Sequence, residues 1–277
     1  MQIGIRLHDV AKGTIEERAQ IAASQGFACA HIALSKLCDY RMTLPELTPG
    51  WAMYLRHVFE REQLDIAVLG CYLNLATPDL EALRKNQDTY KAHLRFASLL
   101  GCGVVGTETG APNTAYKFEE ACHTEGALQT FITNLRPVVE YAEKCGVILA
   151  LEPVYKHIMW NPAQTRKVLD AIDSPNLQII FDPVNLLDVS NYERREEIFA
   201  EALQTFGTEI AMIHLKDFQI QDGKLLACAP GTGCMDYDLI LKYAKEHKPY
   251  IHATLENTTP ENAVFSREFL QKRYELV

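Results

Sequence analysis

The segment LQTFITNLRPVVEYAEKCGVILALE, residues 128–152, shows the unit from which the fold is predicted. Its first part, residues 128–144, places apolar side chains three and four positions apart, which is the spacing of an amphipathic helix. Gly146 is positioned to end this helix, and the apolar run 147–151 that follows is typical of a strand buried on both faces. The unit is therefore a helix, a buried strand and, at the end of the strand, the carboxylate of Glu152.

The same unit recurs along the chain. Apolar runs of five to eight residues lie at positions 3–7, 28–34, 66–73, 103–107, 147–151, 177–181, 210–215 and 250–255. Eight runs in 277 residues leave about 35 residues for each strand and its crossover helix, which is enough for a βαβ unit. The longer connections, at residues 35–50, 109–125 and 217–236, mostly follow strands, as they do at the C-terminal face of a barrel. We therefore predict the α/β class, with a single (β/α)8 TIM barrel as one domain over residues 1–277.

A doubly wound open sheet is the alternative fold for alternating strands and helices. That fold normally carries a glycine-rich phosphate-binding loop after its first strand. Residues 7–13, LHDVAKG, contain one glycine, and no linker-like low-complexity segment divides the chain. The barrel is therefore the better interpretation.

Composition argues against several other classes of protein. The chain has 27 Lys and Arg against 36 Asp and Glu, a net charge of −9, and no run rich in Lys or Arg. This argues against binding to nucleic acid or to an anionic membrane. No stretch approaches the roughly 18 apolar residues of a membrane helix, and no signal peptide is visible at the N-terminus. Eight scattered cysteines without a CxxC pair are typical of reduced thiols, so we expect a cytoplasmic protein.

Four strand ends carry side chains suited to a metal ion. Glu152, Asp182, His214 and Glu256 end or follow the last four apolar runs. Buried carboxylates are costly unless their charge is compensated, and a divalent cation is the simplest compensation where such residues converge at a barrel mouth. Oxygen ligands with one imidazole suit Mn²⁺, our first expectation, and also Mg²⁺, Co²⁺ or Zn²⁺. The alternative is ion pairing at the rim, but only Lys216 is at hand and no Arg lies at these strand ends.

Short motifs at the strand ends carry a family resemblance. They are LEP at 151–153, FDPVN at 181–185, HLKD at 214–217, PGTG at 230–233 and LEN at 255–257. In this order and at these positions they resemble the xylose-isomerase-like TIM-barrel superfamily, and more narrowly its sugar phosphate isomerase/epimerase branch. That branch includes ketose 3-epimerases, hydroxypyruvate isomerase and inosose dehydratase. The resemblance covers nearly the whole chain.

The resemblance implies a single-metal site held by Glu152, Asp182, His214 and Glu256. It also implies that Glu152 and Glu256 move the substrate's proton, as the matching glutamates do in ketose 3-epimerases. Asn185 departs from the pattern, because ketose 3-epimerases and the related DNA-repair endonucleases carry His three residues after the aspartate. We expect Asn185 to orient Asp182, a water molecule or the substrate.

Three further residues are candidates for substrate binding. Glu108, among small neighbours at the end of the fourth run, is expected to contact substrate or to act as an acid or base. His157 either hydrogen-bonds a substrate hydroxyl or faces solvent in its loop. Lys216 either polarises or holds a substrate group or neutralises the carboxylate cluster. Together with Asn185 these residues form the predicted substrate-binding set.

The preferred function is a metal-dependent isomerase or epimerase of a small ketose, polyol or hydroxy-carbonyl compound. It works by removing a proton next to a metal-chelated carbonyl. A dehydratase or lyase acting on an inosose or an oxidised sugar uses the same site and is the main alternative. A DNA-repair endonuclease fits less well, since its additional histidines are missing, and a non-catalytic sugar-binding barrel stays open. We expect a carbohydrate substrate without phosphate and, as in related barrels, a homodimer or homotetramer.

Overall fold

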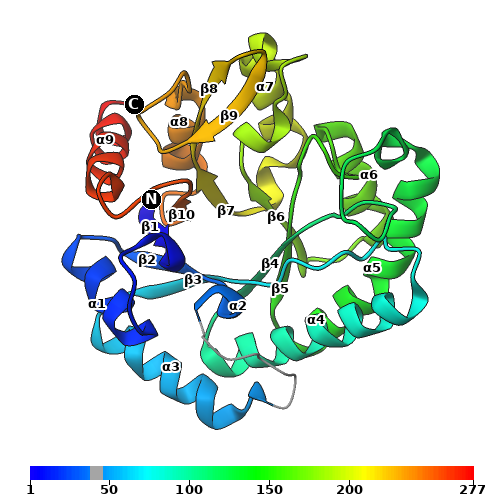
Figure 1. Ribbon diagram of the computed structural model, residues 1–277, viewed down its shortest axis with the longest axis horizontal. Coiled ribbons are helices and arrows are strands. Elements are labelled where there is room, and N and C mark those ends of the chain that lie inside the picture. Colours follow the sequence, from blue (N-terminus) through cyan, green and yellow to red (C-terminus); the bar gives the residue numbers. More distant parts are fainter. Residues whose placement is uncertain (38–45) are drawn as a thin grey trace.

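Eight parallel strands form a closed barrel in the computed structural model, which describes residues 1–37 and 46–277 (Figure 1). Their order around the barrel is β1-β10-β7-β6-β5-β4-β3-β2. The strands are β1 (Gln2–Arg6), β2 (Cys29–Ile32), β3 (Asp65–Gly70), β4 (Val104–Glu108), β5 (Ile148–Glu152), β6 (Leu177–Phe181), β7 (Ile210–Leu215) and β10 (His252–Leu255). Each lies on one of the eight apolar runs, so the predicted single (β/α)8 TIM barrel is confirmed and the open sheet is not formed.

Helices surround the barrel on its outer side (Figure 1). The main ones are α1 (Ile15–Ser24), α3 (Pro49–Arg61), α4 (Leu80–Leu100), α5 (Glu125–Cys145), α6 (Pro162–Ile172), α7 (Arg195–Phe206), α8 (Asp238–His247) and α9 (Ala263–Leu276). The helix predicted over 128–144 lies within α5, and Gly146 ends it in the left-handed conformation with φ 64°. No helix of the described residues has the length and apolar character to cross a membrane.

The barrel is filled by a layer of apolar side chains below the strand ends. Val68, Ala150, Ile180 and Met212 form a cluster of their own, each fully buried. Ala150, Ile180 and Met212 lie two positions before Glu152, Asp182 and His214, respectively. Because alternate residues of a strand share a face, these apolar residues lie on the same side of their strands as the polar ones.

A glycine makes room for this inner layer. A Cβ at Gly106 of β4 would come within 2.6 Å of Ile180 and 2.7 Å of Val68. A second and larger apolar core connects the strands to the helices. The barrel is therefore a packed support for the polar residues at its mouth.

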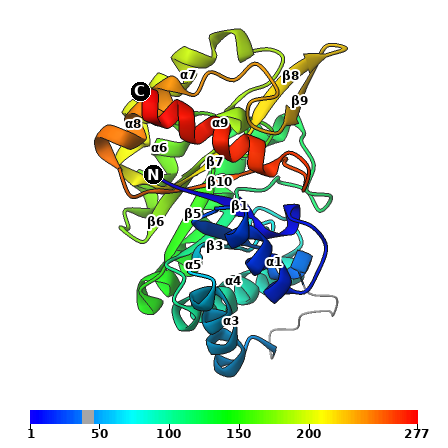
Figure 2. The ribbon, with the colours of Figure 1, turned by 90° about the vertical axis from the view of Figure 1, so that its left-hand side faces the viewer.

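The long connection after β7 is a hairpin and not a simple loop. β8 (Asp217–Gln221) and β9 (Lys224–Cys228) pair in antiparallel fashion and extend away from the barrel strands (Figure 2). The turn that contains Gly231 and Gly233 then folds back, and both backbone N–H groups donate hydrogen bonds to the buried carboxylate of Asp217. The base of the hairpin is thereby fixed to the end of β7.

Truncation inside the barrel should cost more stability than truncation outside it. Replacing Ile180 with Ala is expected to lower the free energy of unfolding by about 2–5 kcal/mol, because the surrounding barrel cannot collapse onto the space that is left. The control is Leu239→Ala on α8, where the side chain is 41% exposed and a change below about 1 kcal/mol is expected. Urea unfolding followed by circular dichroism measures both, and equal losses would contradict a packed interior.

Candidate metal centre

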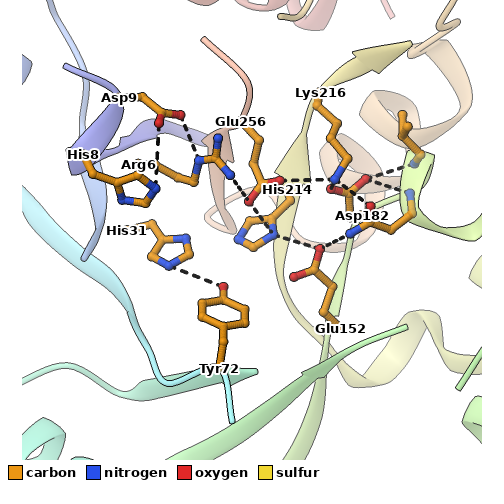
Figure 3. Close-up of polar contacts among 12 residues, drawn as sticks. Arg6, His8, Asp9, His31, Tyr72, Glu152, Asp182, His214, Lys216 and Glu256 are labelled. Atoms are coloured by element: carbon orange, nitrogen blue, oxygen red, sulfur yellow. Dashed lines mark hydrogen bonds and ion pairs between the residues drawn. The ribbon is translucent and has the colours of Figure 1, made fainter. Parts of the chain in front are cut away.

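Four residues predicted to bind a metal meet at the mouth of the barrel (Figure 3). One possible ligand atom from each lies within 4.8 Å of the others; the residues are Glu152, Asp182, His214 and Glu256. All four are buried, with at most 6% of the residue surface exposed. They come from β5, β7, the turn after β6 and the residue after β10, and these strands are neighbours in the sheet. The convergence inferred from the strand ends is therefore present in the fold.

The donor atoms of this cluster fit a divalent cation. His214 Nδ1 lies 3.3 Å from Glu152 Oε1 and 3.4 Å from Glu256 Oε1. Within the described part of the chain, neither ring nitrogen of His214 has a well-directed hydrogen bond, and Oδ2 of Asp182 is contacted by Lys216 at 2.8 Å. Since buried polar atoms are normally paired, the imidazole can accept a cation as its partner once it has lost its proton. Three carboxylates with one imidazole suit Mn²⁺, Mg²⁺, Co²⁺ or Zn²⁺.

The crowding of carboxylates shifts the pKa values in the cluster. Burial by itself lowers the pKa of His214, but the charges of Glu152 and Glu256 outweigh it and raise that pKa to about 9. Burial raises the pKa of Asp182 to about 6, against the opposing charge of Lys216. The imidazole of His214 therefore holds a proton at neutral pH, which a cation would have to displace.

Lys216 compensates part of the negative charge. Its Nζ lies 2.8 Å from Asp182 Oδ2 and 3.2 Å from Glu256 Oε2, and it donates a 2.6 Å hydrogen bond to Oδ1 of Asn185. Burial lowers the pKa of Lys216, but the two carboxylates outweigh it and raise that pKa above its ordinary value. The three contacts match the three N–H donors of an ammonium group. Of the two roles predicted for Lys216, these contacts favour neutralisation of the carboxylates.

Asn185 connects Lys216 to the opposite side of the cluster. Its Nδ2 donates a 2.6 Å hydrogen bond to Glu152 Oε1, while its Oδ1 accepts from Lys216. The backbone N–H groups of Val184 and Asn185 donate to Oδ1 of Asp182 at 3.0 and 3.2 Å. The turn after β6 thus fixes the side chains of Asp182 and Glu152. Hydrogen bonds of this kind orient the ligands of metal sites in proteins.

Arg6 is a cation that sequence analysis missed. Its Nη1 lies 3.3 Å from Glu256 Oε1, and its Nε donates a 2.8 Å hydrogen bond to Asp9 Oδ2. The parallel pairing of β1 with β10 places Arg6 beside Glu256. The expectation that no Arg accompanies the cluster is therefore wrong. The available signal was that Arg6 is the one charged residue in the run 3–7.

His31 of β2 is a second residue that was missed. It is 1% exposed and stacks on His214 with ring centroids 5.3 Å apart and an interplanar angle of 9°. Its Nε2 lies 3.4 Å from the hydroxyl of Tyr72. Together with Glu256, His31 and His214 form a second group whose ligand atoms lie within 4.8 Å of one another. The signal was a single imidazole in the apolar run 28–34.

A cavity of about 620 Å³ opens over the cluster, a volume within the range of small-molecule sites. Glu108, Asn185 and Lys216, three of the four residues predicted to bind substrate, line it. His157 stands beside Glu108 instead, with its Nδ1 3.6 Å from Glu108 Oε2. The hydroxyl of Tyr116 donates to the same oxygen at 3.3 Å.

The surroundings of Glu108 shift its pKa and that of its neighbour His157. Burial raises the pKa of Glu108. Burial also lowers the pKa of His157 to about 4, so His157 stands beside Glu108 as a neutral imidazole at neutral pH. His157 therefore contacts a wall residue of the cavity, and its predicted direct contact with substrate remains a prediction.

The raised pKa of His214 predicts that metal binding releases a proton. Since His214 is protonated below about pH 9, the apparent affinity for Mn²⁺ should rise with pH, by up to about tenfold per unit, and level off above that value. The same shift stabilises the metal-free protein below about pH 6.5, and this stabilisation is lost as the pH rises through about 9. Titration calorimetry in buffers of different ionisation enthalpy counts the protons released. Affinity independent of pH, with no proton released, would contradict the assignment.

Replacing Lys216 with Met should have opposite effects on the stability of the metal-free protein and on its affinity for Mn²⁺. Loss of its ion pairs with Asp182 and Glu256 is expected to lower the free energy of unfolding of the metal-free protein by about 3–5 kcal/mol. The variant should nevertheless bind Mn²⁺ more tightly, because a neighbouring positive charge is gone, and saturating Mn²⁺ should restore stability. Lys242→Met, at a side chain 63% exposed, is the control. Weaker Mn²⁺ binding by the Lys216 variant would refute this description of the charges.

Comparison with known proteins places the chain in a family. A family model described as a xylose isomerase-like TIM barrel matches residues 19–273. A 3-oxo-isoapionate decarboxylase of Pectobacterium atrosepticum is 30% identical over 237 residues, which cover 82% of this chain and 74% of that protein.

Solved structures show the same fold. A D-tagatose 3-epimerase-like protein is 21% identical and has a TM-score of 0.77, with 100% of this chain and 98% of that chain covered. The IOLI protein with a bound zinc atom is 16% identical and has a TM-score of 0.74, with 99% and 96% covered. The matched family model, the 30% identical relative and the closed barrel agree. The chain belongs to the xylose isomerase-like TIM-barrel family.

Proposed function

We propose that the chain is a divalent-metal-dependent isomerase or epimerase of a small hydroxy-carbonyl carbohydrate. The observation that carries this proposal is the buried group of three carboxylates and one imidazole, whose two glutamates line a cavity of about 620 Å³. Glu152, Asp182, His214 and Glu256 would hold the cation. Mn²⁺ is the first choice, and the zinc atom in the related IOLI structure supports a site of this kind in the same barrel. When bound, the cation would polarise a substrate oxo group and the neighbouring hydroxyl. This would acidify the C–H bond of the carbon that carries this hydroxyl.

The two glutamates have different surroundings, which suggests different tasks. Glu152 accepts a hydrogen bond from the neutral amide of Asn185. Burial raises the pKa of Glu256, but His214 and the permanent cations Lys216 and Arg6 outweigh it and hold that pKa well below its usual range. We therefore assign removal of the substrate proton to Glu152. Glu256, which these cations keep ionised, would return a proton to the opposite face only after it has taken one up from solvent.

Glu108 would bind the substrate beside this pair. Parallel pairing of β4 with β5 places Glu108 next to Glu152 at the same level of the barrel. One of its oxygens accepts from Tyr116, and its carboxylate lines the cavity. A carboxylate of this kind accepts hydrogen bonds from sugar hydroxyls. Lys216 and Asn185 would act on the substrate through the orientation of the metal ligands.

A lyase is the second candidate, and the relative named as a 3-oxo-isoapionate decarboxylase favours it. Loss of carbon dioxide from a 3-oxo acid leaves the electron pair next to the oxo group, where the same cation would stabilise it. A protonated glutamate would then supply the proton to carbon. Product analysis separates the candidates, because only the lyase changes the number of carbon or oxygen atoms in the product.

A screen in D₂O tests the proposed function. The protein is purified with Mn²⁺ and incubated with ketoses, inososes, hydroxypyruvate and 3-oxo sugar acids, and the products are analysed by nuclear magnetic resonance. An isomerase or epimerase incorporates deuterium at one carbon and conserves mass otherwise, and this activity should be lost with chelator. Metal-dependent release of carbon dioxide or water would assign the lyase instead. Conversion that persists unchanged in chelator would contradict a metal enzyme.

Substitution of either glutamate by Gln is expected to abolish net conversion, by at least about 10³-fold, because an amide cannot accept the proton. An amide oxygen is still a weak ligand, so bound metal is quantified in the same samples and activities are compared at matched occupancy. The control is Glu268→Gln, at a side chain 64% exposed on α9. Full activity of Glu152→Gln or of Glu256→Gln at matched occupancy would refute the two-glutamate mechanism.

A further inference from the structure

The lining of the cavity above the candidate metal centre carries acidic and basic side chains in different parts. Glu108 lies in its lining, while another part of the lining consists of basic side chains from β1, the turn after it, β2 and α2 (Leu34–Leu37). These side chains, the basic wall, are Arg6, His8, His31 and Lys36. Figure 3 shows the first three together on the side of Glu256 that faces away from Lys216.

Arg6 keeps donor groups for a ligand. A guanidinium carries five N–H donors in a planar fork. The Nε of Arg6 is used by Asp9, and its Nη1 faces Glu256. Within the described residues, the second terminal nitrogen of Arg6 donates no hydrogen bond, and the Arg6 side chain is 19% exposed in the cavity lining.

The two imidazoles of the basic wall add neutral hydrogen-bonding groups. Burial, with the charges of Arg6 and Lys36, lowers the pKa of His8 to about 4. In the described part of the chain, the Nδ1 atoms of His8 and His31 are buried without a hydrogen-bond partner. Leaving such atoms unpaired costs free energy, so a ligand oxygen that pairs with them is favoured.

Lys36 supplies the charge of the basic wall that no carboxylate of the described residues 1–37 and 46–277 pairs with. It is exposed on α2 and lines the cavity, and among the described residues it forms no ion pair. Arg6, in contrast, is shared between Asp9 and Glu256. One uncompensated positive charge matches the single negative charge of a carboxylate better than the roughly two charges of a phosphate monoester.

We propose that the basic wall binds a carboxylate group of the substrate, and that the substrates are therefore oxo sugar acids, not neutral ketoses. The inference rests on the proposed function, because the oxo and hydroxyl groups of the same molecule are assigned to the metal centre. The carboxylate would lie against Lys36 and the free edge of Arg6. The remaining hydroxyls would extend toward Glu108, which repels an anion and accepts from hydroxyl groups.

Binding of matched ligands tests this inference. D-gluconate and D-glucitol share a carbon chain and differ at one end, where gluconate has a carboxylate, while D-glucitol 6-phosphate carries a dianion. Their affinities are measured by titration calorimetry on Mn²⁺-loaded protein at constant free Mn²⁺. Gluconate should bind at least about threefold more tightly than either glucitol compound, as expected for one added charge-assisted contact.

Variants of the exposed Lys36 then locate the contact. Lys36→Met should remove most of the preference for gluconate and leave the affinity for glucitol within about twofold, since an exposed lysine contributes little to the fold. Lys36→Glu should reverse the preference. The control Lys272→Met, also exposed but on α9, should change neither affinity.

Three results would overturn the carboxylate site. They are equal affinities for gluconate and glucitol, a gluconate affinity unchanged by Lys36→Met, and tighter binding of glucitol 6-phosphate than of gluconate. None of these results affects the proposed function. That function fails separately, if the protein does not bind Mn²⁺ or if the D₂O screen finds no metal-dependent turnover.

Discussion

The structure depends on one electrostatic constraint, which is the burial of three carboxylates at the mouth of a barrel. Glu152, Asp182 and Glu256 are at most 6% exposed, and their oxygens surround one imidazole. Buried carboxylates that have neither solvent nor a positive charge nearby would take up a proton or would destabilise the fold. Lys216, Arg6 and protonated His214 supply three positive charges against these three carboxylates and Asp9, which shares Arg6. A divalent cation that displaces the proton of His214 would balance the charges of the group.

The barrel divides the surroundings of this cluster into two sides with different chemistry. On the side of β6 and β7, Asn185 and Lys216 form a continuous chain of contacts from Glu152 to Glu256. On the side of β1 and β2, Arg6 and His31 line the cavity, and the Nδ1 atom of His31 has no hydrogen-bond partner among the described residues. The first side fixes the proposed ligands, and the second is available to a substrate. The first side depends on the pairing of β6 with β7, and the second depends on barrel closure, because the pairing of β1 with β10 brings Arg6 to Glu256.

Much of this arrangement follows from the sequence, for a physical reason. Strands buried on both faces are read as apolar runs, and the carboxyl ends of parallel strands meet at one end of a barrel. Glu152, Asp182 and His214 could therefore be placed together without coordinates. The contact of Arg6 with Glu256 could not, because it depends on closure between the first and last strands and on which face of β1 the side chain takes.

Two further features of the loops show which signals are local and which depend on tertiary contacts. The hairpin β8–β9 was treated as a loop, although Asp222 and Gly223, with φ of 50° and 68°, form a dipeptide typical of tight hairpin turns. His157 was predicted either to hydrogen-bond substrate or to face solvent, and its contact with Glu108 could not be foreseen, since the path of its loop depends on tertiary contacts such as that of Met159 N–H with Thr109. Side-chain direction in loops is the part that residue patterns leave open.

The central claim is that the buried cluster holds one divalent cation. The most direct measurement is anomalous X-ray diffraction at the manganese edge from crystals grown with Mn²⁺. The account predicts a single strong peak with one oxygen or nitrogen atom of Glu152, Asp182, His214 and Glu256 at about 2.0–2.4 Å from it. A peak at another place, or a cluster that stays closed around protonated His214 at saturating Mn²⁺, would contradict the account.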